Sequence, residues 1–122
     1  MTKRILIADD DDDLRQALVQ LLELEGFAIE SAPDGRAALG LASMLACDLI
    51  LLDVFMPGAH GLDVLASLRI LLPLVPIIMM SGQAGRNTVA NALSIGAYDF
   101  ILKPFDGESV LAAVNRALGL AN

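Results

Sequence analysis

Five short apolar segments are spaced along the chain, and a longer stretch with apolar residues at helical spacing follows each of them. The segments have the length and composition of β-strands. They span residues 4–8, 27–32, 49–52, 77–80 and 98–102. The third segment, Leu-Ile-Leu-Leu, is apolar on both faces, as a strand must be when helices cover it from either side. Because alternating strands and helices require parallel crossovers, the sequence predicts a doubly wound α/β fold with a five-stranded parallel sheet.

The helical stretches carry their own signals. The first begins near Leu14 and ends at Gly26, a residue typical of helix ends. Four further helices are predicted from apolar stripes at residues 37–39, 62–68, 89–93 and 110–118. The length of 122 residues is enough for one core, so we expect residues 1–122 to form a single domain.

The composition excludes several classes of function. The net charge of −7 opposes direct binding of a nucleic-acid backbone. No apolar run approaches the roughly 20 residues needed to cross a bilayer, and no export signal is evident, so we expect a cytoplasmic protein without membrane contact. The single cysteine, Cys47, and the single histidine, His60, exclude an internal disulfide and a zinc site of soft ligands.

Polar side chains stand at the ends of the predicted strands. Asp9 and Asp10 follow the first strand and Asp53 the third. Ser81 follows the fourth strand and Lys103 the fifth. In doubly wound sheets, ligands bind at the carboxyl ends of the strands, near the point where the strand order reverses. We therefore expect these five side chains to form one site.

Such a site has the chemistry of phosphoryl binding. Carboxylates about 4 Å apart repel by about 4 kcal/mol per pair at an effective dielectric constant near 20, so the three aspartates need a cation. Oxygen ligands without imidazole or thiolate favour Mg2+, which completes its shell with water and phosphate oxygens. Lys103 adds a positive charge and Ser81 a hydroxyl donor. Asp53 stands alone at the end of the middle strand, before a turn at Pro57 and Gly58, and is the candidate nucleophile.

Four stretches of the sequence resemble the receiver domain of two-component response regulators. They are ILIADDDDDLRQAL, DLILLDVFMPGAHGLDVL, PIIMMSG and GAYDFILKPFD, in the family's order and at its spacings, and they span nearly the whole chain. The resemblance implies a flavodoxin-like sheet with strand order 2-1-3-4-5, flanked by five helices. It also implies a signalling module that catalyses only its own phosphorylation and dephosphorylation, and not a turnover enzyme.

The family's site residues match positions of this chain. Asp53 would be the phosphoacceptor, taking the group from a phosphohistidine on a sensor histidine kinase or phosphotransfer protein, or from a small phosphodonor. Asp10 and Asp53 would bind Mg2+ through carboxylate oxygens, Phe55 through its backbone carbonyl, and Asp9 mostly through water. Lys103 would pair with the Asp53 carboxylate before transfer and with the phosphoryl group afterwards.

Two residues match the family's switch positions. Ser81 would turn its hydroxyl toward the phosphoryl group, and Phe100 would move inward to fill the space left behind. The switch would remodel the face formed by the fourth helix, fifth strand and fifth helix, through which receivers contact an output domain or a downstream protein. If a homodimer forms there on phosphorylation, the sparse charge favours apolar contacts around Val89, Leu93 and Ala113.

Three residues depart from the family's pattern or tune it. Phe55 and Gln83 lie two residues after Asp53 and Ser81, and in the family these positions flank the path by which water attacks the phosphoaspartate. Phe55 is bulky and cannot orient a water molecule, although Gln83 could do so in part, so we expect a long-lived phosphorylated state. His60 stands where the family usually has an acidic or polar residue, and we expect an exposed loop residue there.

Three alternatives compete with this interpretation. Phosphatases with an aspartate nucleophile also have an Asp-x-Asp pattern after the first strand, which Asp9 and Asp11 imitate, but they need a further acidic pair after the lysine and usually a cap region. Flavin-binding domains cradle phosphate in a loop of Gly, Ser and Thr, where this chain has five aspartates. A receiver-like module that binds partners without phosphorylation is disfavoured because every expected site residue is present.

The run of five aspartates divides by position. Asp9 and Asp10 leave the first strand and form the metal side of the site. Asp11 or Asp12 is expected to cap the first helix, and Asp13 to lie in its first turn, where carboxylates meet the positive end of the helix dipole. The same stretch therefore serves both a metal site and the start of a helix.

Overall fold

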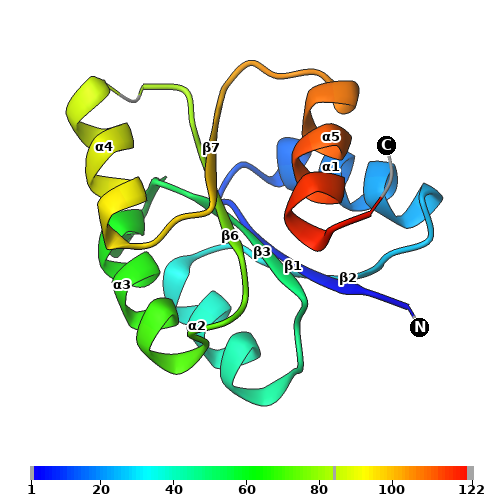
Figure 1. Ribbon diagram of the computed structural model, residues 1–122, viewed down its shortest axis with the longest axis horizontal. Coiled ribbons are helices and arrows are strands. Elements are labelled where there is room, and N and C mark those ends of the chain that lie inside the picture. The colour runs from blue at the N-terminus through cyan, green and yellow to red at the C-terminus, as the bar shows by residue number, and fades with distance from the viewer. Residues whose placement is uncertain (1, 84, 121–122) are drawn as a thin grey trace.

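The computed structural model describes residues 2–83 and 85–120, and a sheet of five parallel strands forms its centre (Figure 1). The strands are β1 (Arg4–Ala8), β2 (Ala28–Ala32), β3 (Leu49–Asp53), β6 (Ile77–Ser81) and β7 (Asp99–Leu102). The helices are α1 (Asp12–Leu24), α2 (Gly35–Met44), α3 (Gly61–Leu71), α4 (Arg86–Ile95) and α5 (Gly107–Leu118). The five strands differ from the predicted segments by one residue at most at either end.

The sheet has the order β2-β1-β3-β6-β7, and all neighbouring strands are parallel. When only these five strands are counted, this is the predicted order 2-1-3-4-5. The order reverses between β1 and β3, which places the predicted ligand edge at their carboxyl ends. Every residue of the central strand β3 is buried, as its uninterrupted apolar sequence requires.

A short antiparallel hairpin between β3 and α3 was not predicted. Its strands are β4 (Phe55–Met56) and β5 (Ala59–His60), and Phe55 pairs with His60. Gly58 lies in the turn with φ of 80°, a conformation that glycine adopts without a steric cost. The segment that follows the predicted nucleophile is therefore a structured hairpin and not an open loop.

His60 is exposed, as predicted, but it has a structural role that a loop residue lacks. It ends β5, and its Nδ1 atom accepts a hydrogen bond from the Leu62 N–H at 3.2 Å. The side chain thereby satisfies one of the free N–H groups at the start of α3. His60 thus connects the hairpin to the helix that follows it.

Aspartates cap three other helices. Asp11 accepts from the Leu14 N–H at the start of α1, Asp34 caps α2, and Asp106 caps α5. Of the two aspartates predicted as possible caps of α1, Asp11 is the cap and Asp12 is the first helical residue. Because the run of aspartates begins this helix, the end of β1 and the start of α1 are separated by only three residues.

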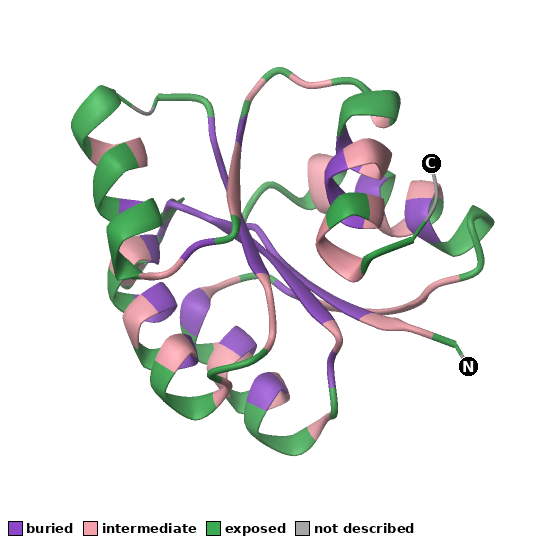
Figure 2. Cartoon of the chain, viewed as in Figure 1, coloured by how far each residue is buried: buried purple, intermediate pink, exposed green. Residues whose placement is uncertain are grey.

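Helices cover both faces of the sheet, with α1 and α5 on one side and α2, α3 and α4 on the other (Figure 1). Alternate residues of the strands contribute to two apolar clusters, one under each layer of helices. Figure 2 shows β1, β3 and β6 buried through most of their length, whereas the outer strands β2 and β7 are mostly half-buried, and the helices bury mainly the side that faces the sheet. Among the described residues, no helix is long and apolar enough to cross a membrane.

Candidate functional site

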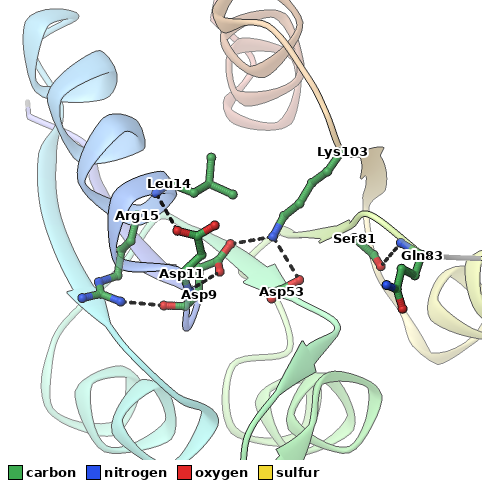
Figure 3. Close-up of polar contacts among 8 residues, drawn as sticks. All are labelled: Asp9, Asp11, Leu14, Arg15, Asp53, Ser81, Gln83 and Lys103. Carbon is green, nitrogen blue, oxygen red and sulfur yellow. Dashed lines mark hydrogen bonds and ion pairs between the residues drawn. The ribbon is translucent and has the colours of Figure 1, made fainter.

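The carboxyl ends of the parallel strands lie at one end of the sheet, its carboxyl edge. The predicted site residues meet there (Figure 3). Asp53 and Ser81 are the last residues of β3 and β6, and Asp9 and Lys103 directly follow β1 and β7. Neighbouring strands are parallel, so their carboxyl ends, and the residues at those ends, lie at the same end of the sheet. Asp10, one residue further along, completes the acidic part of this edge.

Three carboxylates form a tight acidic cluster. One oxygen from each of Asp9, Asp10 and Asp53 lies within 4.8 Å of the other two. Asp9 and Asp53 are buried and Asp10 is exposed, so the cluster opens to solvent on one side. A set of hard oxygen donors with one open side fits Mg2+, which retains part of its water shell in proteins. Phe55, whose carbonyl the family would add, begins β4 two residues after Asp53.

Lys103 lies between the two buried carboxylates. Its Nζ atom donates a hydrogen bond to Asp9 Oδ2 at 2.9 Å and is 3.5 Å from Asp53 Oδ1. Burial lowers the pKa of Lys103, but the hydrogen bond that it donates to Asp9 and the negative charges of both aspartates outweigh burial, so its pKa lies above the ordinary lysine value. The ammonium is therefore charged and held closer to Asp9 than to the candidate nucleophile.

Asp53 has an unusual acidity. The pKa of Asp53 is raised to about 6. Burial is the largest cause, the Asp9 carboxylate acts in the same direction, the Lys103 ammonium opposes both, and Asp10 adds a smaller upward effect. The ionised form of Asp53 is therefore costly in the metal-free fold, which is the electrostatic situation that a bound cation relieves. Strongly shifted groups of this kind concentrate at functional sites.

Asp9 and its backbone are fixed by contacts that the sequence analysis did not identify. Asp9 Oδ1 accepts from the Asp11 N–H at 2.9 Å. Arg15 reaches back from α1 and donates to the Asp9 carbonyl at 2.7 Å and to Asp12 Oδ1 at 2.6 Å. The spacing of Asp12 and Arg15 on a helix was a usable signal for their pairing, but the contact with Asp9 depends on how the chain turns into α1.

Gly61 is a second residue that the sequence analysis missed. A Cβ atom at this position would lie 2.5 Å from the Asp53 carbonyl oxygen and from the Val54 Cα. The Gly61 N–H donates to the Val54 carbonyl at 2.6 Å. The start of α3 thus packs directly on the backbone that carries the candidate nucleophile, and only glycine leaves room for this approach.

Ser81 is fully buried, and its hydroxyl oxygen accepts a hydrogen bond from the Gln83 N–H at 3.1 Å. In Figure 3 this contact lies on the far side of Lys103 from Asp9. Gln83 itself is exposed. Phe100 is half-buried and packs against the apolar cluster under α2, α3 and α4. The predicted site residues thus lie on or beside the carboxyl edge of the sheet, except Phe100, which lies within β7.

Phe55 and His60 lie on the hairpin beside the acidic cluster. Their rings meet edge to face, with centroids 5.5 Å apart. Asp10 and the hairpin residues 55–60 line a hollow of about 520 Å³. Phe55 is 45% exposed, so the ring borders this open space and is not part of the core.

The face formed by α4, β7 and α5 exposes several apolar side chains, among them Leu93, Tyr98 and Leu102. Arg116 forms an ion pair with Asp99 at 3.1 Å across this face. The prediction that Ala113 contributes apolar contacts to a homodimer is wrong, because this residue of α5 is buried in the core and is not on the surface.

Together, the order of the sheet and the acidic edge define a doubly wound α/β domain with a cluster of three carboxylates that could hold a metal ion. The chain matches the model of the response regulator receiver domain over residues 5–115, and it belongs to this family. Within it, the chain is 38% identical to the regulatory protein AtoC of Escherichia coli K12 over 117 residues, which are 96% of this chain and 25% of AtoC.

Two further comparisons agree with this assignment. The transcriptional regulatory protein CpxR of Escherichia coli K12 is 38% identical over 115 residues, which cover 94% of this chain and 49% of CpxR. The crystal structure of a CheY-like response regulator receiver domain protein from Methanospirillum hungatei JF-1 superposes with a TM-score of 0.95 at 30% identity, covering 98% of this chain and 95% of that one. The chain spans between a quarter and a half of the two regulators that it matches.

Proposed function

We propose that this chain is a phosphoacceptor signalling domain in which Asp53 takes a phosphoryl group in a Mg2+-dependent reaction. The observation that carries the proposal is the position of Asp53, a buried carboxylate at the end of the central strand with two carboxylates and the Lys103 ammonium around it. Membership of the receiver family supports the same role. The donor is a phosphohistidine on a sensor histidine kinase or phosphotransfer protein, or a small phosphodonor.

Transfer to Asp53 requires its ionised form. With a pKa of about 6, the side chain is mainly a carboxylate at neutral pH. One carboxylate oxygen attacks phosphorus, the bond from phosphorus to the imidazole nitrogen of the donor breaks, and the imidazole keeps the electron pair. Lys103, which Asp9 holds at 2.9 Å, offsets the negative charge beside Asp53 before and after transfer.

Mg2+ is the cation that this donor set favours. Asp10 and Asp53 would supply carboxylate oxygens to this ion, and Phe55 its backbone carbonyl. Both oxygens of Asp9 already accept hydrogen bonds, from Asp11 and Lys103, which supports a role for Asp9 through water. When bound, the ion neutralises charge on the phosphoryl oxygens.

The domain acts on itself and turns over no separate substrate. The phosphoryl group leaves Asp53 by hydrolysis, and the bulky Phe55 beside the acidic cluster slows the approach of water. Gln83 is exposed and offers only partial help in orienting a water molecule. We therefore propose a long-lived phosphorylated state, and a faster decay in Phe55→Asn than in the parent is the result that supports it.

Phosphorylation is read out on the face formed by α4, β7 and α5. To reach the phosphoryl group, the Ser81 hydroxyl leaves the Gln83 N–H, and Phe100 moves from its half-buried position into the space that opens. The exposed Leu93, Tyr98 and Leu102 make this face suitable for an output domain, a downstream protein or a second phosphorylated copy.

The proposal is tested by incubating the chain with acetyl phosphate and Mg2+ and measuring intact mass. We expect the addition of one phosphoryl group, which is lost in Asp53→Asn and when EDTA removes the metal. Asp48→Asn is the matched control, because Asp48 accepts from the Arg4 N–H at the opposite edge of the sheet, and it should be phosphorylated as the parent is. A parent that gains no phosphoryl group, or an Asp53→Asn variant that still turns over a phosphomonoester, contradicts the proposal.

A further inference from the structure

The His60 ring is held on two sides. It is the cross-strand partner of Phe55 in the hairpin, and the two rings meet edge to face at an interplanar angle of 82°. This geometry is favoured between aromatic rings. On its other side, the His60 Nδ1 atom accepts the hydrogen bond from the Leu62 N–H at the start of α3. The orientation of the His60 ring is therefore set by the helix, and the ring in turn restricts the movement of Phe55.

Phe55 borders a hollow that is also lined by Asp10, a neighbour of the phosphoacceptor in the acidic cluster. The hollow of about 520 Å³ is lined by Asp10 as well as by Phe55 and His60. Asp10 is the exposed member of the acidic cluster, with a carboxylate oxygen within 4.8 Å of one from Asp53. Because Phe55 is 45% exposed, close packing in the core does not fix its ring, and the contact with His60 is a specific restraint on it.

We propose that His60 is a positioning residue that prolongs the phosphorylated state by keeping the Phe55 ring beside the phosphoacceptor. The inference rests on the proposed phosphorylation of Asp53. In hydrolysis, a water oxygen bonds to phosphorus, the bond from phosphorus to the Asp53 oxygen breaks, the Asp53 carboxylate keeps the electron pair, and the water proton leaves to solvent or phosphate. The water must approach in line with the breaking bond, and a Phe55 ring released into solvent no longer obstructs that approach.

Two substitutions separate the ring contact from the helix cap. Asparagine is a good N-cap, so His60→Asn removes the ring and keeps a cap on α3. Phenylalanine cannot accept the hydrogen bond from Leu62, so His60→Phe keeps the ring and loses the cap. Each protein is phosphorylated with acetyl phosphate and Mg2+, the donor is removed, and the phosphorylated fraction is followed by intact mass.

We expect decay in His60→Asn to be about two- to tenfold faster than in the parent, the range that the coupling of one aromatic pair provides. Decay in His60→Phe should stay within about twofold of the parent, although its urea midpoint falls. In a Phe55→Ala background, His60→Asn should have no further effect, because the two residues act through one contact.

Equal decay in the parent and His60→Asn overturns the inference, and so does an acceleration in His60→Phe as large as that in His60→Asn, which would assign the effect to the cap. Both results leave the proposed function intact, because the parent has then been phosphorylated. A parent chain that accepts no phosphoryl group overturns the proposed function and this inference with it.

Discussion

A partly buried basic side chain lies at each end of the parallel strands, and the two side chains have different surroundings. The carboxyl ends of the strands form the carboxyl edge of the sheet, and their amino ends form its amino edge. At the carboxyl edge, Lys103 contacts Asp9 at 2.9 Å and Asp53 at 3.5 Å. At the amino edge, Arg69 near the end of α3 donates to the backbone carbonyls of Pro73 and Val75. Burial lowers the pKa of Arg69, whereas for Lys103 burial is outweighed by the carboxylates and the pKa is raised.

The difference teaches where charge serves the fold and where it serves chemistry. Arg69 satisfies carbonyl groups in the turn after a helix, a local structural task. The carboxyl edge instead concentrates three carboxylates, and burial destabilises the ionised form of Asp53 among them. Replacing buried charges by apolar residues of similar size is often neutral or stabilising. Substitutions at the carboxyl edge should therefore change both phosphorylation and stability, whereas substitutions at the amino edge should change stability alone.

Removing the Lys103 ammonium from the carboxyl edge should have the largest effect on stability and on phosphorylation. In Lys103→Met the buried Asp9 and Asp53 lose their partner, and we expect the free energy of unfolding at pH 7 without Mg2+ to fall by about 3 kcal/mol, with phosphorylation strongly reduced. Lys3 is the only other lysine of the chain, so Lys3→Met is the matched control and should stay within about 0.5 kcal/mol of the parent. Urea unfolding measures both. Equal losses in the two variants would contradict the comparison.

Removing the candidate nucleophile should stabilise the metal-free chain. Since the folded-state pKa of Asp53 is about 6 against an unfolded value of 3.8, the folded state binds a proton more tightly, and parent stability falls as pH rises through this window. Asp53→Asn has no carboxylate there and does not lose this stability. At pH 7 its free energy of unfolding should be about 2 to 3 kcal/mol higher than that of the parent, and the two values should converge below about pH 4.

Urea unfolding across this pH range gives the measurement, and added Mg2+ supplies the control. The metal should stabilise the parent more than Asp53→Asn and narrow the difference at pH 7. A parent whose stability instead rises relative to Asp53→Asn between pH 4 and pH 6 would show that the Asp53 carboxylate is favoured by the fold, contrary to the description of the site.

Adding a methyl group at Gly61, which packs on the backbone of the nucleophile, should lower the free energy of unfolding by about 2 kcal/mol. In Gly61→Ala the new methyl group would lie 2.5 Å from the Asp53 carbonyl oxygen, and backbone atoms cannot move aside as a flexible side chain can. We expect lower stability together with slower phosphorylation by acetyl phosphate. Gly40→Ala is the control, because a Cβ atom there meets nothing within 4 Å. Normal phosphorylation kinetics in Gly61→Ala would separate the glycine from the site.

The smallest effect is expected at the amino edge. Arg69→Met loses two hydrogen bonds to carbonyl groups. It also removes a charged guanidinium whose buried Nε atom has no hydrogen-bond partner among the described residues. These contributions oppose each other, so stability should change by about 1 kcal/mol or less, and the rate of phosphorylation should not change. A variant that folds normally but is phosphorylated slowly would show that the two edges are coupled.

Much of the fold was predictable because its signals are local. The apolar segments predict the strands to within one residue, and the carboxyl-end rule for doubly wound sheets predicts that Asp9, Asp53 and Lys103 lie together. The hairpin of β4 and β5 was missed because strands of two residues have no periodicity to detect. The cap formed by His60 was missed for the same reason, since it depends on where that hairpin ends.

The parts of the site that could not be predicted depend on tertiary distances. The sequence places Lys103 at the correct edge, but only the folded chain shows that its nearer partner is Asp9 and not Asp53. Gly61 looks like any other glycine before a helix until α3 packs on the backbone of the nucleophile. The contact from Arg15 to the Asp9 carbonyl is likewise set by the turn into α1.

The central claim is that Asp53, and no other carboxylate of the acidic cluster, receives the phosphoryl group. Sodium borohydride reduces an aspartyl phosphate to homoserine, so reduction of the phosphorylated chain followed by peptide mass spectrometry locates the acceptor directly. We predict homoserine at position 53, formed only when acetyl phosphate and Mg2+ were both present. Homoserine at position 9 or 10, or a phosphoryl group that resists borohydride on another residue, would contradict the account.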